Sequence, residues 1–310
     1  MKKLKIIYAL FFITLLMLST KTTIAQLTGL HAMYFENQYL ANPAMAGIDE
    51  GLTLNATYQR QWMTAPGTPV LQNFTAEYQA GYNVGLGLLF NNDQAGLINK
   101  SRLMATFAYH IPINETGRLN FGLSAGVTNS HINYNNIVGD QGDLSVALFN
   151  NSKLLAVTPD GDVGASYTSD GFNMQVAIPN VGSTLFNTTG NTLGVDRPVS
   201  YLAASYIIPF TNDYNDGVTL EPKAAFRSVK GFDNIIDAGA NVVIKEMLSV
   251  SAMYHSNKSS TLGGGFNLSP VRVVFSYTFN TGALGSYYNN TFELGIKYSS
   301  KAKRERDSTF

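Results

Sequence analysis

Histidine is the first residue type to test for chemistry, because imidazole can bind metals and transfer protons. The four histidines are His31, His110, His131 and His255, and no two of them are four residues apart. The chain contains no cysteine. Zinc sites in sequences show His or Cys pairs at short intervals, so this spacing does not predict a metal site. We expect each histidine to be a lumen or loop residue, and we expect no cofactor.

Nucleophilic catalysis would need a serine in contact with a histidine, and a third group that orients the ring. The sequence offers two adjacent pairs, Ser130-His131 and His255-Ser256. Neighbours on a strand point to opposite faces, so neither pair can make this contact within one strand. No glycine-rich nucleophile or nucleotide motif separates a strand from a helix. Gly263–Gly265 lies within a strand pattern, where close packing or a bend explains it. The sequence predicts a protein that is not an enzyme.

Charged residues are the remaining candidates for function, and they make up only 14% of the chain. Six of them fall on the polar side of alternating segments and are expected to point inward: Arg102, Glu221, Lys223, Arg227, Asp237 and Arg272. They could line a channel or form a salt-bridged plug. With so few charges, a filled or gated lumen is at least as compatible with the sequence as an open pore.

The segments that carry these residues have a two-residue period, which is the period of a β-strand. From residue 119 to 128, Leu, Phe, Leu, Ala and Val alternate with Asn, Gly, Ser, Gly and Thr. About fourteen such segments are expected, with lengths near ten residues that suit a tilted strand across a bilayer. They cover residues 51–62, 70–80, 83–92, 100–111, 118–130, 160–168, 171–178, 199–209, 217–228, 234–244, 246–256, 258–268, 270–280 and 290–299.

The composition of the two faces favours a membrane barrel over a soluble sandwich. A sandwich buries its apolar face and has a wet face that is usually rich in charge. Here the polar face is mostly Gly, Ser, Thr and Asn, and the apolar face is Leu, Val, Phe and Tyr. Aromatic residues that resemble a girdle close the apolar stripes: Tyr58, Trp62, Tyr78, Tyr109, Tyr167, Tyr254 and Tyr298. The fold predicted is an all-β transmembrane antiparallel β-barrel that closes because lipid forbids open edges.

The domain organisation follows from the ends of the chain. Residues 1–25 combine early lysines, an apolar run too short to span a bilayer and a small residue at Ala25, as in a cleaved signal peptide. An N-terminal anchor helix is the alternative. We expect residues 26–50 to be a periplasmic lead-in or plug, 51–299 the barrel and 300–310 a charged periplasmic tail. Export would remove four lysines and no acid, so nothing suggests a nucleic-acid partner.

Several short motifs along the chain resemble those of one known protein family. Gln38-Tyr39-Leu40-Ala41-Asn42-Pro43-Ala44-Met45-Ala46-Gly47 is similar to the family's NPAYAG signature, with Met45 where Tyr is usual. Tyr58-Gln59-Arg60-Gln61-Trp62 resembles its YRxQW motif. Weaker strand motifs are Tyr109–Pro112, Phe121–Gly126 and Ala177–Asn180. From about Gln38 to Tyr298 the sequence thus resembles the PorP/SprF family of the type IX secretion and gliding-motility apparatus of Bacteroidetes.

This resemblance implies a function that composition could not indicate. Members of the family act without catalysis in the outer membrane, where they assist secretion and surface anchoring of large adhesins that bear a C-terminal sorting domain. The implied partners are that sorting domain, periplasmic and peptidoglycan-associated lipoprotein components of the machine, and outer-membrane lipid. The alternative is an outer-membrane channel or transporter for small solutes. The two separate on the lumen, because an anchor is expected to be plugged.

The motif residues are the candidate partner or assembly site: Asn42, Pro43, Ala44, Gly47, Arg60, Gln61 and Trp62. Pro43 fixes its own φ and holds Asn42 extended, while Gly47 can adopt a positive φ. We expect the resulting turn to fold the lead-in against the periplasmic mouth of the barrel. Asn42 could also bond the backbone two residues on. Arg60 interrupts an outward apolar stripe and is expected near the outer interface, where a charge costs about 0–1 kcal/mol.

Overall fold

The computed structural model describes residues 34–61, 68–96, 98–132, 157–181, 199–210, 217–229, 233–280 and 290–300. The expected signal peptide, Trp62 and the tail from residue 301 lie outside these residues, as do most of the connections 131–158 and 180–198. Among the described residues, no helix is both long and apolar enough to cross a membrane. Two short 3₁₀ helices, η1 (Gln38–Leu40) and η2 (Pro43–Met45), precede the strands.

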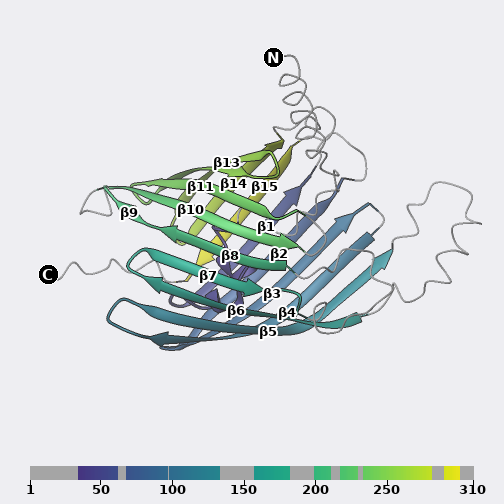
Figure 1. Cartoon of the computed structure of the whole chain (residues 1–310), viewed down its shortest axis with the longest axis horizontal. Coiled ribbons are helices and arrows are strands. Elements are labelled where there is room, and N and C mark those ends of the chain that lie inside the picture. The colour runs from purple at the N-terminus through teal and green to yellow at the C-terminus, as the bar shows by residue number, and fades with distance from the viewer. Residues whose placement is uncertain are drawn as a thin grey trace, which may run out of the picture.

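Nearly all other regular structure is β-strand, as the two-residue period predicts (Figure 1). The strands are β1 (Leu52–Arg60), β2 (Val70–Gly81), β3 (Val84–Ala95), β4 (Ile98–Pro112), β5 (Arg118–Ile132), β6 (Val157–Ser169), β7 (Phe172–Ile178), β8 (Val199–Tyr206), β9 (Ile208–Pro209), β10 (Val218–Val229), β11 (Ile235–Ile244), β12 (Leu248–His255), β13 (Ser259–Leu268), β14 (Val271–Asn280) and β15 (Thr291–Ser299). The lengths expected for a tilted bilayer strand are therefore confirmed for most of them.

The sheet closes on itself. Each strand pairs antiparallel with its neighbour in sequence, and β1 pairs with β15, so no edge is left open. Strands β8 and β9 both pair with β10 and together act as one interrupted strand. The barrel thus has fourteen strand positions, and the predicted fold class is confirmed. A closed barrel satisfies every ladder hydrogen bond within the protein, as a lipid environment requires.

The two ends of the barrel differ in their connections. Short turns at residues 82–83, 113–117, 170–171, 245–247 and 269–270 lie at one end, which we name the short-turn mouth. The two longest connections, residues 133–156 and 179–198, lie at the opposite end, the long-loop mouth. Outer-membrane barrels have short periplasmic turns and longer outer loops. The start of β1 and the end of β15 are therefore on the periplasmic side.

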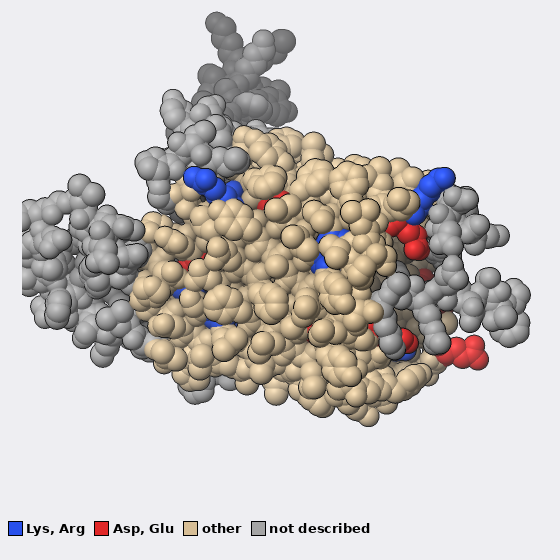
Figure 2. Space-filling model, turned by 180° about the vertical axis from the view of Figure 1, so that it is seen from behind, with Lys and Arg blue, Asp and Glu red and all other residues tan. Residues whose placement is uncertain are grey.

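The outer surface of the barrel is apolar. Along β5, Phe121, Leu123 and Val127 are exposed, while the residues between them are mostly buried in the lumen. Figure 2 shows only scattered charged side chains on this face of the molecule. Exposed tyrosines lie near both ends, with Tyr78, Tyr109 and Tyr298 close to the short-turn mouth and Tyr58 and Tyr254 close to the long-loop mouth. This pattern matches a lipid-facing band between two aromatic girdles.

Candidate functional site

The lead-in does not stop at the periplasmic mouth but lies inside the lumen. Tyr34, Asn42, Ala44 and Ala46 each have 0% exposure. From the start of β1 the segment extends back through the barrel toward the long-loop mouth. Its far end reaches Asp237, three residues into β11 on the long-loop side. The sequence predicted the turn from local geometry, and the structure places that turn deeper than expected.

The Asn-Pro-Ala turn has the local geometry that its residue types predict. Asn42 is extended, with φ −145° and ψ 114°, and its side chain accepts a hydrogen bond from the Ala44 backbone nitrogen at 3.0 Å. Pro43 begins η2, where its missing N–H costs nothing. Gly47 has φ +66°, a conformation that glycine adopts without strain. A Cβ on Gly47 would also lie 2.7 Å from the Gly85 Cα atom.

A row of very small residues on the barrel wall receives this turn. Adjacent strands pair in register from Gly85 to Ala108, Gly122, Gly164 and Ala177, so the five residues form one line across β3 to β7. We name it the small-residue row. A Cβ on Gly122 would lie 2.2 Å from the Pro43 carbonyl carbon, and one on Gly164 would lie 2.0 Å from Asn42 Oδ1. Only glycine at these positions lets the turn approach so closely.

Neutral hydrogen bonds fix the register of the segment on this row. Asn42 Nδ2 donates to the Ala165 carbonyl oxygen at 3.1 Å and to Gln175 Oε1 at 3.4 Å. The hydroxyl groups of Tyr39 and Thr106 are 2.6 Å apart, and His110 Nε2 is 3.2 Å from the Ala46 carbonyl oxygen. In addition, Gln38 Oε1 accepts hydrogen bonds from the side-chain amides of Asn173 and Gln175. These contacts join the turn to strands β4, β6 and β7.

The far end of the segment is held by charges instead. The Tyr34 hydroxyl donates to Asp237 Oδ2 at 2.7 Å. Arg227 binds the same carboxylate with two nitrogens, at 2.8 and 2.9 Å, and His255 Nδ1 is 2.6 Å from Asp237 Oδ1. Arg227 also lies over the Tyr34 ring, 5.6 Å from its centroid. Asp237 is fully buried, so the ion pair and its hydrogen bonds are needed to offset its desolvation.

The structure assembles an Asp–His–Thr chain that the sequence did not reveal. His255 Nε2 is 2.8 Å from Thr261 Oγ1, across the β12–β13 hairpin, while Nδ1 faces Asp237. This is the order of contacts in a catalytic triad. Thr261 is also 2.7 Å from the Thr278 hydroxyl, and Asp237 is already bound by Arg227 and Tyr34. All these groups are therefore engaged in holding the segment and the wall together.

A second enzyme-like spacing has a similar explanation. Gly122-Leu123-Ser124-Ala125-Gly126 has the Gly-x-Ser-x-Gly spacing, but it lies in the middle of β5 and not at a strand-to-helix turn. The Ser124 hydroxyl is 2.6 Å from that of Thr106, which contacts Tyr39. The serine is thus part of the wall beneath the lead-in. Among the described residues no cluster of acids and histidines could hold a metal ion.

The six inward charges predicted from the sequence all form ion pairs. Arg102 bridges Asp160 and Asp162 at 3.0 and 2.6 Å. Lys223 pairs with Glu221 at 3.0 Å, and Arg272 pairs with Glu36 of the lead-in at 3.0 Å. Together with the Arg227–Asp237 pair, most of these contacts join wall strands to one another, and among the six charges only Arg272 forms its ion pair with the lead-in.

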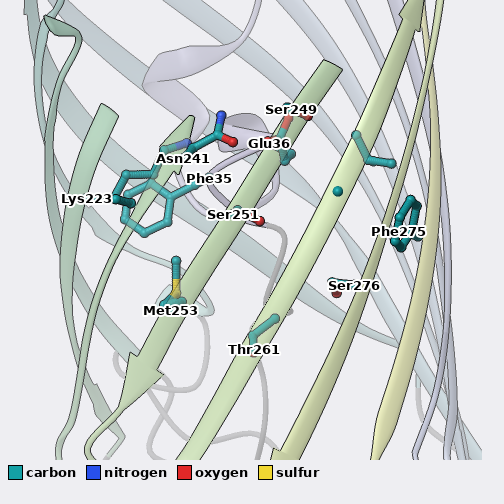
Figure 3. Close-up of a pocket in the computed structure, with 13 residues that line it drawn as sticks. Phe35, Glu36, Lys223, Asn241, Ser249, Ser251, Met253, Thr261, Phe275 and Ser276 are labelled. Carbon is teal, nitrogen blue, oxygen red and sulfur yellow. The ribbon is translucent and has the colours of Figure 1, made fainter. Parts of the chain in front are cut away.

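Space remains beside the far end of the segment. A cavity of about 30 Å³ lies between Phe35 and Glu36 of the lead-in and the wall formed by β10 to β14 (Figure 3). A volume of this size holds about two water molecules. The buried Asn241 Oδ1 and Ser276 Oγ line it without a protein hydrogen-bond partner in the described structure. The small-residue row, in contrast, is filled by the turn.

The remaining motif residues end β1 at the long-loop mouth. Arg60 is exposed, on the same side as Ala56 and Tyr58, and its Nε donates to Thr68 Oγ1 at 3.2 Å. Arg60 is therefore on the outward stripe, as expected, and it is the last residue of β1. Gln61 follows the strand, and its backbone nitrogen donates to the Pro69 carbonyl at 3.0 Å. The turn at Asn42–Gly47 and the Arg60–Gln61 pair are thus at opposite ends of β1.

The comparison of sequences decides the family. Residues 24–298 match the PorP/SprF family, described as type IX secretion system membrane proteins.

The chain belongs to the PorP/SprF family.

The resemblance seen in the short motifs is thereby confirmed over nearly the whole chain. No curated protein matches the sequence. This PorP/SprF protein is a component of the type IX secretion machinery. Its closed barrel and apolar outer band place it in the outer membrane.

Solved structures with a similar architecture are outer-membrane proteins of low sequence identity. Omp33 of Acinetobacter baumannii is 9% identical, with a TM-score of 0.45, covering 82% of this chain and 99% of its own. The toluene transporter TbuX of Ralstonia pickettii is 10% identical, with a TM-score of 0.44, covering 83% and 92%. The CymD monoaromatic hydrocarbon channel is 14% identical, with a TM-score of 0.42, covering 90% and 96%.

Proposed function

We propose that this PorP/SprF protein is a plugged, non-catalytic barrel that assists secretion and surface anchoring of a large adhesin with a C-terminal sorting domain. The observation that supports the proposal is the lead-in, which occupies the lumen and contacts wall strands from β2 to β14. A solute channel needs a continuous wet path, whereas this lumen is filled by a segment held at both of its ends. An anchor needs only a stable barrel that presents a partner surface.

We also propose that the motif around Asn42 and Gly47 serves the partner role and not barrel assembly alone. All fourteen strand pairings form without a backbone hydrogen bond from the lead-in. The turn is thus not part of the hydrogen-bond ladder that closes the sheet, yet its geometry is tightly specified, and this supports a role beyond the ladder. The partners proposed for the filled barrel are the sorting domain of the adhesin and the periplasmic, peptidoglycan-associated lipoproteins of the machine.

The test replaces Pro43 and Gly47 with Ala in a strain whose own copy is deleted. Ala at residue 47 would need a positive φ and would press on Gly85, so the turn is expected to leave its seat. We expect normal barrel levels in the outer membrane and a loss of adhesin from the cell surface. If barrel and adhesin are both normal, the turn has no partner role. If both fall together, the motif serves assembly only.

A matched control changes the same residue types away from the lead-in. A Cβ added to Gly81 would meet open space, and Pro112 is exposed at the end of β4. The Gly81→Ala, Pro112→Ala variant is expected to leave both barrel and adhesin unchanged. A loss of adhesin in this control would mean that the assay reports general damage to the barrel.

A further inference from the structure

The lead-in relates to the wall as a bound peptide does, and not as a strand of the sheet. Its backbone hydrogen bonds are internal: Leu40, Ala41 and Asn42 donate to residues 37–38, and Met45 and Ala46 donate to residues 42–43. In the described structure no backbone-to-backbone hydrogen bond joins residues 34–46 to a strand. Each hydrogen bond described between the lead-in and the wall has a side chain on at least one of the two partners, as in Asn42 Nδ2 to the Ala165 carbonyl oxygen and His110 Nε2 to the Ala46 carbonyl oxygen. The covalent link to the barrel is the short stretch Gly47–Gly51, where Asp49 and Glu50 are exposed.

The wall selects this peptide through both shape and hydrogen bonding. The Pro43 backbone lies so close to Gly122 that a Cβ there would clash with it. The Asn42 side chain lies equally close to Gly164. Gln175 and the Ala165 carbonyl oxygen accept hydrogen bonds from the Asn42 amide, and the Thr106 hydroxyl forms a hydrogen bond with the Tyr39 hydroxyl. The sequence features that fit are thus a tyrosine, an Asn-Pro pair three residues later and small residues after it.

Some buried hydrogen-bonding groups of the wall and the lead-in have no partner when the lead-in is bound. Tyr201 pairs with Ala177 and so continues the small-residue row onto β8. Tyr201 is only 1% exposed, and its buried hydroxyl has no hydrogen-bond partner in the described structure. Asn37 Oδ1 of the segment is also buried and without a partner there. A buried polar group without a partner costs about 1–3 kcal/mol, so a segment that keeps the lead-in's contacts and adds a hydrogen-bond partner for Tyr201 would bind this wall more tightly than the lead-in.

We infer that the small-residue row and its flanking polar side chains form a peptide-binding site, which the lead-in fills in cis and which a segment of a partner protein can fill in trans. The ligand class is a peptide with the pattern Tyr-x-x-Asn-Pro-Ala-x-Ala in a turn with 3₁₀ geometry. Its C-terminal side lies at the short-turn mouth, where the tether of the lead-in is attached. The inference concerns exchange at the wall and does not depend on the proposed adhesin role.

The experiment uses the full-length barrel, which folds before the tether is cut. A protease site is inserted between Asp49 and Glu50, which are exposed. The host carries Asn42→Ala so that its own segment is weakened. A fluorescent synthetic peptide of residues 34–48 with the native sequence is then added in detergent, and its anisotropy is measured before and after cleavage.

Saturable uptake is expected only after cleavage, because a short tether holds the resident segment at an effective concentration on the order of millimolar. A peptide with Asn42→Ala should bind about tenfold more weakly, since one lost buried hydrogen-bond partner costs roughly 1.4 kcal/mol or more. Uptake no better than that of a scrambled peptide would overturn the inference. Failure of adhesin display in cells would leave this binding result unaffected.

Two wall variants separate a specific site from general stickiness. Gly164→Ala places a Cβ 2.0 Å from the native position of Asn42 Oδ1 and should abolish uptake. Gly81→Ala, with nothing within 4 Å of its Cβ, should bind as the cut host does. Equal peptide binding to the Gly164→Ala and Gly81→Ala variants would contradict the assignment of the small-residue row as the binding site. Dimers of the uncut protein cross-linked through residues 34–47 would show exchange between copies and would overturn the choice of a partner segment.

Discussion

The two ends of the lead-in are held in different ways. Residues 38–47 lie on β3 to β7, where contact is made through glycines and neutral hydrogen bonds. Residues 34–36 lie against β8 to β14, where contact is made through Asp237, Arg227 and Arg272 and a cavity remains. The first end is recognised by shape and the second by charge.

This difference predicts different sensitivities. The end near the short-turn mouth is expected to tolerate no added volume, because its backbone approaches the wall within the radius of a methyl group. The end near the long-loop mouth has room but depends on complete ion pairing, because its charges are buried. The variants below test each sensitivity in turn.

The largest effect is expected from Asp237→Ala. It removes the carboxylate that binds Arg227, Tyr34 and His255 at once, and Arg227 stays buried without this carboxylate. Breaking a buried ion pair from one side costs about 3–5 kcal/mol. The free energy of unfolding in urea is the measurement. Adding Arg227→Met should recover a large part of the loss, and no recovery would show that the ion pair is not the cause.

Gly122→Ala tests the other end with a single methyl group. Its Cβ would lie 2.2 Å from the backbone of Pro43 and Ala44, so the turn must move away. Overpacking of this kind costs about 1–3 kcal/mol. Hydrogen exchange of residues 38–47 should become faster in this variant. Gly81→Ala is the matched control, and equal exchange in the two variants would mean that the turn is not seated on Gly122.

Asn42→Ala removes the side chain that caps η2. It also removes the amide that donates hydrogen bonds to Gln175 and to the Ala165 carbonyl oxygen. A lost cap with a lost buried hydrogen bond should cost about 1–2 kcal/mol. Hydrogen exchange of residues 38–47 measures this loss as a decrease in the free energy of local opening. Asn42→Asp keeps the acceptor for the Ala44 nitrogen and should restore only the capping part. An unchanged opening free energy for the alanine variant would argue against sequence-specific recognition.

The smallest effect is expected from Glu36→Gln. The Glu36–Arg272 pair is partly exposed, at 26% and 23% for the two side chains, and such pairs contribute about 0–1 kcal/mol. Double-mutant analysis with Arg272→Gln should give a coupling within this range. A coupling as large as that of Asp237 with Arg227 would remove the distinction between deep and peripheral charges.

The strands were predictable because the alternation of side chains within each strand depends only on the environment of its two faces. The alternation in residues 118–130 depends only on which face meets lipid, and β5 follows it. Strands β8 and β9 form the exception, since Ile207 bonds to the Gly171 carbonyl and interrupts the ladder with β10. That interruption depends on a neighbouring turn, which the periodicity of residues 199–209 does not reveal.

The site was predictable only in its local part. The positive φ of Gly47 and the side-chain turn of Asn42 follow from residue type. The depth of the segment follows from Gly122 and Gly164, which are far from it in sequence. In the sequence these glycines look like generic small lumen residues. Their common level becomes visible only when strand register is known, since Gly122 pairs directly with Gly164.

Conductance in planar bilayers tests the central claim, that the lead-in plugs the lumen, most directly. The full-length barrel, free of its export segment, is compared with the same protein after cleavage at residues 49–50 and removal of the freed segment. The intact protein should show no steady single-channel current, and the stripped barrel should conduct until synthetic peptide 34–48 is added. Steady conductance of the intact protein, equal to that of the stripped barrel, would contradict the account.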